Sequence, residues 1–245
     1  MTPRRAALAA ALSTLCLQTA TAGPADYVYT PTVEYGEREI DFKAGTASKK
    51  GEADASAASV GFGYGATEWW FTEIYGKWNR GGTGGTRFDA FEWENKFQLT
   101  ETGKYPVDLG FLLEIERPQD RSEGYEVKYG PLLQTDLGKF TVNANLLFER
   151  HYRATEPSNL EAGYQLQVKY RYRPEFEFGL QAFGDLGKWN RWERAGEQSQ
   201  RVGPAIFGKF KLEGRQAIKY NAAFLVGTTG HSPDRNFRMQ VEYEF

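Results

Sequence analysis

Apolar and polar residues alternate along most of this chain, in segments of about ten residues separated by turn-forming residues. The last segment alternates strictly up to a terminal aromatic residue. A period of two is typical of β-strands with one apolar and one polar face. Twelve segments fit this pattern: Tyr35–Ala44, Ala57–Ala66, Trp70–Trp78, Phe88–Leu99, Val107–Glu116, Tyr125–Gln134, Phe140–His151, Leu160–Arg173, Phe176–Leu186, Arg201–Phe210, Ile218–Gly227 and Phe237–Phe245. We therefore expect an all-β fold.

The connections between these segments alternate in length. After odd-numbered segments they are longer and polar, as in Gly187–Gln200, and after even-numbered segments they are mostly shorter, as in Pro174–Glu175. Transmembrane β-barrels share this asymmetry, with longer extracellular loops and short periplasmic turns, and bacterial ones have an even number of strands. The sequence predicts a transmembrane antiparallel β-barrel over residues 35–245. Twelve strands fit best, although roughly ten to fourteen would suit such a pattern.

Composition agrees with a barrel. The mean hydropathy is −0.60, as expected when only alternate residues of each strand face lipid. Aromatic residues make up 15% of the chain, and those at expected turns, among them Trp69, Trp70, Phe71 and Tyr170, predict an interfacial girdle. The 30 basic and 32 acidic residues nearly balance. With no basic patch interleaved with aromatics, we expect no nucleic-acid binding.

The first residues predict export. Arg4 and Arg5 precede an apolar run from Ala6 to Leu17, and Ala20-Thr21-Ala22 has the small residues that signal peptidase accepts. We therefore expect a signal peptide at residues 1–22, cleaved after Ala22, and a periplasmic N-terminal segment at residues 23–34. Cys16, the one cysteine, lies inside the expected signal, so the exported chain would hold no disulfide.

The C-terminal segment carries a resemblance to a known class of protein. Phe237, Met239, Val241, Tyr243 and Phe245 lie on one face of the last expected strand. This pattern resembles the C-terminal signature of bacterial outer-membrane barrels, which the barrel-assembly machinery recognises. The resemblance implies that Tyr243 and Phe245 act as an assembly signal. It also implies a location in the outer membrane, in contact with its lipid and lipopolysaccharide.

More broadly, the chain resembles small monomeric outer-membrane porins and channels, although no motif identifies a specific family.

The inward faces of the expected strands are charged. Acidic residues gather on the early strands, and we assign to an acidic wall Glu37, Glu39, Glu92, Glu94, Glu114 and Glu116. Basic residues gather on the later strands, and we assign to a basic wall Lys169, Arg171, Arg173, Arg201, Lys209 and Lys219.

Two interpretations of these walls remain. Buried charges are costly unless they are paired, whereas water in a channel would solvate them. The first and favoured interpretation is a narrow passive pore for small polar or charged solutes. Gly61, Gly63 and Gly65 support it, because they place no side chain inside. The second is a non-conducting structural or adhesion barrel whose lumen is plugged by its own charges.

A lipid-modifying enzyme is the least favoured alternative. An outer-membrane phospholipase uses a Ser–His pair, and this chain has two histidines, His151 and His231. No serine lies two residues from His151, and His231 is directly followed by Ser232, an arrangement that rarely activates a nucleophile. We find no spacing typical of metal ligands and no phosphate loop. We therefore expect neither catalysis nor a cofactor.

Overall fold

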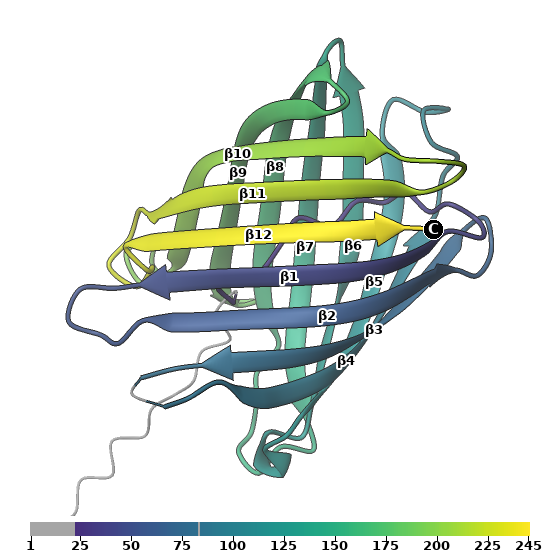
Figure 1. Ribbon diagram of the computed structural model, residues 1–245. Helices are drawn as coiled ribbons and strands as arrows, with labels where there is room; N and C mark the ends of the chain where they lie inside the picture. Colours follow the sequence, from purple (N-terminus) through teal and green to yellow (C-terminus); the bar gives the residue numbers. More distant parts are fainter. Residues whose placement is uncertain (1–22, 83) are drawn as a thin grey trace, which may run out of the picture.

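The computed structural model describes residues 23–82 and 84–245, so the expected signal peptide lies outside the described residues. Within this part, twelve antiparallel strands form a closed barrel in which neighbours in sequence pair and β1 closes against β12 (Figure 1). The strands are β1 Arg38–Ser48, β2 Ala55–Gly65, β3 Trp70–Arg80, β4 Arg87–Gln98, β5 Asp108–Pro118, β6 Tyr125–Leu137, β7 Phe140–Tyr152, β8 Glu161–Arg173, β9 Phe176–Lys188, β10 Ser199–Lys211, β11 Ala217–Gly227 and β12 Arg235–Glu244. This confirms the predicted fold class and strand number.

The two rims of the barrel differ as expected. The connections after odd-numbered strands form what we call the loop rim, at residues 49–54, 81–86, 119–124, 153–160, 189–198 and 228–234. Those after even-numbered strands form the turn rim, at residues 66–69, 99–107, 138–139, 174–175 and 212–216. One of the two shortest turns, at residues 138–139, places Gly138 at a φ of 62°, which glycine adopts without steric cost. Residues 99–107 are the exception, because this connection is as long as a loop.

Within the loop at 119–124 lies a single 3-10 turn, η1, Arg121–Glu123. No helix among the described residues is long and apolar enough to span a membrane.

The alternation of the sequence becomes the two faces of the barrel wall. Ile74 is 62% exposed on the outside, whereas its neighbour Tyr75 is 1% exposed in the lumen. Apolar residues exposed on the outer face are those that lipid would cover. Trp69 and Tyr172 are exposed at the turn rim, as a girdle requires. Phe71 was wrongly expected in that girdle, because it points inward and is 3% exposed.

The interior contains apolar contacts that the sequence pattern does not predict. One buried cluster joins Val28 to residues of β9, β10 and β11: Phe183, Ala205, Phe207, Ala223 and Leu225. A second joins Tyr29 and Tyr27 to residues of β5, β6 and β7: Leu112, Leu132 and Leu147. Both clusters depend on residues that precede β1. The centre of the barrel is therefore packed with side chains around the N-terminal segment.

Candidate functional site in the lumen

The N-terminal segment, residues 23–34, lies inside the barrel. The side-chain amide of Asn236, near the loop rim, donates to the Pro24 carbonyl oxygen at 2.9 Å. The backbone N–H of Val33 donates to Oε1 of Gln98, at the turn-rim end of β4, at 2.7 Å. The segment thus runs along the lumen, behind β12 and β1 in Figure 1. This position corrects our expectation of a periplasmic segment.

Inward-facing glycines make room for the segment. A Cβ atom at Gly45 would lie 1.8 Å from the carbonyl oxygen of Pro24, and one at Gly65 would lie 1.9 Å from that of Glu34. At Gly110 it would lie 2.8 Å from Cα of Pro31. Any larger residue at Gly45 or Gly65 would collide with this backbone. The barrel wall is therefore shaped to hold a polypeptide.

The space at Gly61 and Gly63 is also filled. A Cβ atom at Gly61 would lie 2.4 Å from the ring of Tyr75, and one at Gly63 would lie 2.4 Å from the ring of Phe71. These glycines accommodate aromatic rings from β3. Our expectation that they leave open space is wrong.

Two tyrosines bind the segment to the acidic wall. The hydroxyl of Tyr27 donates to Oε2 of Glu94 at 2.5 Å, and that of Tyr29 donates to Oε2 of Glu114 at 2.8 Å. Their ring centroids are 4.6 Å apart. The ammonium of Lys43 lies over the Tyr27 ring, 3.6 Å from its centroid. Such hydrogen bonds to charged groups are among the stronger ones in proteins.

The walls themselves are joined by a belt of hydrogen bonds between mostly neutral side chains. Asn145 donates to the Tyr29 carbonyl oxygen at 3.0 Å, and Gln165 accepts from the Tyr29 N–H at 3.2 Å. A second run of these hydrogen bonds passes from strand to strand through Gln134, Asn143, Gln167, Gln181, Arg238, Asn221, Gln240, Asp41 and Tyr75. Charge patterning could not reveal these residues, because most of them are uncharged amides.

The predicted acidic wall faces the lumen. Glu39, Glu92, Glu94, Glu114 and Glu116 are all between 2% and 8% exposed. Glu37 precedes β1 at the turn rim, where burial raises the pKa of its carboxyl against the opposing effect of the Lys219 ammonium.

Lysines on the same side of the barrel partly neutralise the acidic wall. The ammonium of Lys77 pairs with Glu92 at 2.6 Å and also with Glu116. Lys128 lies 3.2 Å from the carboxylate of Glu114. The acidic wall therefore has its own cations and does not depend on the opposite wall for them.

The predicted basic wall does not form one surface. Arg201 is 3% exposed inside the barrel, and Lys169 pairs with Glu177 at 2.7 Å. Arg173 is exposed and Arg171 is partly exposed near the turn rim, where Arg171 pairs with Asp136 at 2.6 Å. The alternation of the sequence assigns both arginines to the lumen, but it does not predict that they lie near its end.

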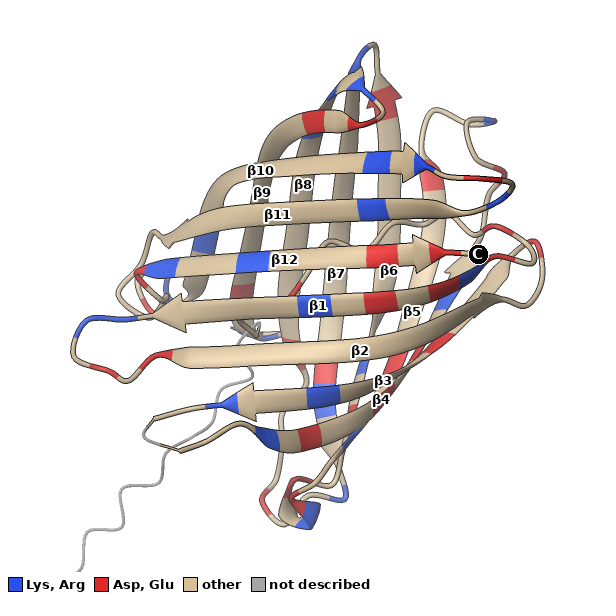
Figure 2. Ribbon diagram, viewed as in Figure 1, with Lys and Arg blue, Asp and Glu red and all other residues tan. Residues whose placement is uncertain are grey.

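Lys209 and Lys219 lie toward the turn rim, next to acidic residues of β12. Lys209 is 2.7 Å from Glu244, and Lys219 is 3.3 Å from Glu242 and also pairs with Glu244. Figure 2 shows basic positions on β10 and β11 beside acidic positions near the C-terminal end of β12. A buried arginine that we had not included in the wall, Arg238, is 1% exposed in the lumen.

A cavity of about 770 Å³ occupies the half of the lumen nearer the loop rim. Its lining runs from Gly81 and Arg87 near the loop rim to Tyr27 and Tyr29 of the N-terminal segment. Ten acidic and five basic residues line it. We call this space the vestibule. Its size is that of a small-molecule site, and its charge favours cations or positively charged groups.

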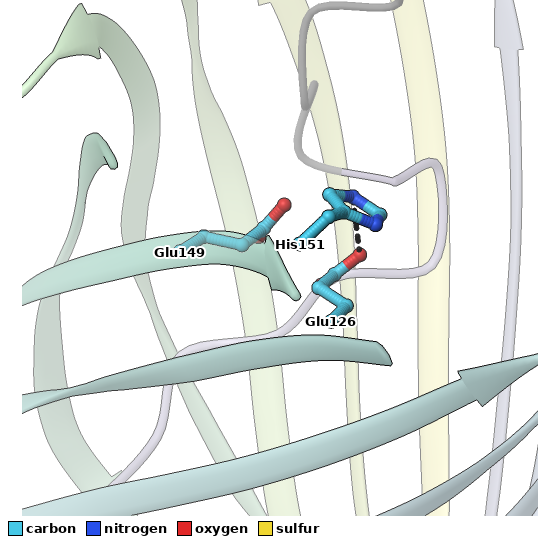
Figure 3. Close-up of side chains that lie close together, drawn as sticks. All are labelled: Glu126, Glu149 and His151. Atoms are coloured by element: carbon cyan, nitrogen blue, oxygen red, sulfur yellow. Dashed lines mark ion pairs between the residues drawn. The ribbon is translucent and has the colours of Figure 1, made fainter. Parts of the chain in front are cut away.

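His151 lies in the vestibule with two carboxylates from the same pair of strands. Its Nε2 is 3.5 Å from Oε2 of Glu126, and Glu149 is the third member of the group (Figure 3). Such a set could hold a metal ion in principle. However, the Lys128 ammonium already lies 3.5 Å from Glu126 and 3.4 Å from Glu149. We therefore assign no metal to this group.

The expected assembly signal lies at the seam where the barrel closes. The backbone N–H of Phe245 donates to the Arg38 carbonyl oxygen at 2.9 Å. The rings of Tyr243 and Phe245 stack with centroids 5.6 Å apart, and Phe245 is 40% exposed. The structure thus places both rings where β12 meets β1. Their recognition during assembly stays a prediction.

Comparison with known proteins identifies the fold. No family model and no curated protein matches the chain. Among solved structures, the NanC porin has a TM-score of 0.57 and 10% identity, covering 84% of this chain and 98% of the porin. An outer membrane channel from Pseudomonas putida F1 has a TM-score of 0.56 and 13% identity, covering 89% of this chain and 97% of the channel.

The translocator domain of the autotransporter NalP from Neisseria meningitidis has a TM-score of 0.55 and 12% identity, covering 86% of this chain and 88% of that domain. At such low identities the likeness is one of fold. The fold is that of bacterial outer-membrane β-barrels, as the sequence predicts.

Proposed function

We propose that this protein is an outer-membrane channel for small polar or charged solutes, and that the N-terminal segment closes it in the present conformation. The observation that carries the proposal is the vestibule, a charged cavity of about 770 Å³ that ends at the segment. A barrel with a purely structural role has no need of a cavity in which ten acidic residues face five basic ones, since buried charges cost free energy unless they are paired or solvated.

The way in which the segment is held supports a closure that can open. Its contacts with the wall are hydrogen bonds to side chains and apolar packing, such as those of Tyr27 and Val28. Every strand completes its ladder with neighbouring strands and without the segment. Because the barrel does not need the segment for its own pairing, the segment could leave while the barrel stays closed as a cylinder.

The alternative is a plugged structural barrel, and one observation favours it. Val28 and Tyr29 are each 7% exposed and sit in apolar clusters in the lumen. Apolar packing at this level excludes water, which a conducting pore requires. The two functions therefore differ in whether the segment ever leaves.

We do not propose a lipid-modifying activity. The Ser232 hydroxyl donates to the Gln200 carbonyl oxygen at 2.8 Å, and Nδ1 of His231 lies 3.2 Å from the Gly196 carbonyl oxygen. Each side chain therefore has a backbone partner that competes with the nucleophile–base contact an acyl transfer would need.

Single-channel recording in planar bilayers tests the channel. The full chain would be compared with a variant in which residues 24–33 are replaced by a Gly-Ser linker of equal length. We expect brief or small openings for the full chain and larger, steady conductance for the variant. If both remain silent while both run as heat-modifiable folded barrels, the channel function is wrong and the structural barrel is favoured.

A further inference from the structure

Two arginines in the lumen have guanidinium nitrogen atoms that form no hydrogen bond with any described residue. Arg201 is 3% and Arg238 is 1% exposed. Nε and Nη2 of Arg201 and Nη1 of Arg238 are buried and donate to no group in the described part of the chain. Buried charged donors without acceptors are costly. These donors are therefore available to an acceptor that a ligand would bring.

The two guanidinium groups lie on one ring and are held in place by neutral side chains. Their Cζ atoms are 5.6 Å and 5.8 Å from the centroid of Phe183. Asn236 accepts from Arg201 at 2.9 Å, and Gln181 accepts from Arg238 at 2.6 Å. Amide oxygens orient the arginines without neutralising them. A planar guanidinium with free donors is suited to a carboxylate.

The N-terminal segment supplies the carboxylate in this structure. Oδ2 of Asp26 lies 3.9 Å from Nη2 of Arg201, within ion-pair range but beyond a hydrogen bond. The next residue, Tyr27, donates its hydroxyl to Glu94, and Tyr29 donates to Glu114. Asp26 to Tyr29 spans at most about 10 Å of extended chain. Over this short distance the segment presents an acid to the arginines and hydrogen-bond donors to the carboxylates.

We propose that Arg201 and Arg238, together with Glu94 and Glu114, bind small amino carboxylates, and that the N-terminal segment occupies this site as an internal competitor. The carboxylate of the solute replaces that of Asp26, and its ammonium replaces the tyrosine hydroxyls. The proposal rests on the channel function and names its class of solute. A zwitterion suits both the acidic vestibule and the arginines behind it, because it carries both charges.

Titration calorimetry on the full, folded chain in detergent tests the site, with 6-aminohexanoate as the probe. The Asp26→Asn variant loses the competing charge but keeps the segment length. We expect its affinity for the probe to exceed that of the wild-type chain about tenfold, because removing an internal competitor raises the fraction of competent sites. Adding Arg201→Gln to Asp26→Asn should abolish this gain. Lys209→Gln, a basic control that pairs with Glu244, should preserve it.

Two one-ended probes complete the design. Hexanoate lacks the ammonium and hexylamine lacks the carboxylate, so both should bind at least tenfold more weakly than 6-aminohexanoate. Hexanoate leaves the two glutamates without a partner, and hexylamine leaves the two arginines without one. The proposal is overturned if Asp26→Asn binds no more tightly than the wild-type chain, or if Lys209→Gln weakens binding as much as Arg201→Gln. If Arg201→Gln fails to fold, Arg201→Lys takes its place, because it keeps the charge but loses the planar fork of donors. Unchanged binding of the probe by Arg201→Lys would then overturn the proposal.

Conductance separates this proposal from the channel function. A chain that conducts potassium chloride but binds no 6-aminohexanoate contradicts only the solute site. A chain that binds the probe in the Asp26→Asn variant but never conducts contradicts the channel.

Discussion

The hydroxyl of Tyr29 donates a 2.8 Å hydrogen bond to Oε2 of Glu114, across 85 positions of sequence. Glu114 is 2% exposed and its other oxygen accepts from Lys128 at 3.2 Å. A buried carboxylate is tolerated when hydrogen bonds and a cation satisfy it. The N-terminal segment therefore helps to stabilise the acidic wall. If the two separate, the Tyr29 hydroxyl and the Glu114 carboxylate both lose this hydrogen bond.

The first prediction concerns this contact. Tyr29→Phe keeps the ring packing but removes the donor, so it should weaken the docking of the segment by about 1–3 kcal/mol. Limited proteolysis should then cut within residues 24–33 of the folded barrel. Tyr105→Phe is the control, because Tyr105 is 55% exposed in the turn at 99–107. Equal protease resistance of the two variants would contradict the docked segment.

The second prediction uses the glycines. Gly45→Val should expel the segment near Pro24, because a Cβ atom would lie 1.8 Å from its carbonyl oxygen. The strands should still pair, so the barrel should keep its heat-modifiable mobility. Gly85→Ala in the loop rim, with no atom within 4 Å of the added carbon, is the control. Loss of the folded barrel in Gly45→Val alone would mean that the segment is required for folding.

The sequence predicts the wall of the barrel well, because a period of two reports directly which side chains face lipid. Glu92 and Phe91 were assigned to opposite faces, and they are 7% and 61% exposed. Strand ends were less accurate. The first strand was expected at Tyr35–Ala44 and lies at Arg38–Ser48, because pairing with β12 and β2 continues past the last alternating residue.

The contents of the lumen were not predictable in the same way. Alternation gives the face of a residue but not its height, which depends on the stagger of strands around the barrel. Arg171 and Arg201 both point inward by pattern, yet Arg171 is partly exposed near the turn rim and Arg201 is buried. The segment itself has no strand period. In the sequence, the apolar run Tyr27, Val28 and Tyr29 is the feature that indicates burial of this segment.

The third prediction is the orientation of the barrel. Cysteines at Lys49, Gly84 and Trp192, all in the loop rim, should react with an impermeant maleimide on intact cells. Cysteines at Lys104 and Gly214, in the turn rim, should react only after the outer membrane is permeabilised, because short turns face the periplasm. The exported chain would contribute no cysteine of its own. Labelling of Lys104 but not Trp192 on intact cells would invert the barrel.

The fourth prediction concerns assembly. Deleting Phe245 removes the N–H that bonds the Arg38 carbonyl oxygen and the ring stacked on Tyr243. We expect a severalfold lower yield of heat-modifiable barrel in the outer membrane, because the seam loses its last pair and the expected signal loses its end. Phe245→Tyr, which keeps an aromatic ring, should restore most of the yield. An unchanged yield after deletion would remove the basis for calling these residues a signal.

The last prediction is the charge preference of the vestibule. Its lining holds ten acidic and five basic residues, and charges inside a narrow channel are poorly screened. The linker variant, if it conducts, should therefore prefer potassium over chloride in its reversal potential under a salt gradient.

Glu149→Gln should reduce this cation preference, because it removes one of the carboxylates around Lys128 and so leaves more of the lysine charge to attract chloride. Arg171→Gln should leave it unchanged, because Arg171 lies near the turn rim, away from the vestibule, and its guanidinium already pairs with Asp136. Each substitution replaces one charge with a neutral amide, so a difference between the two variants reports where in the barrel that charge lies. An anion-selective linker variant, or a larger effect of Arg171→Gln than of Glu149→Gln, would show that permeating ions pass outside the vestibule.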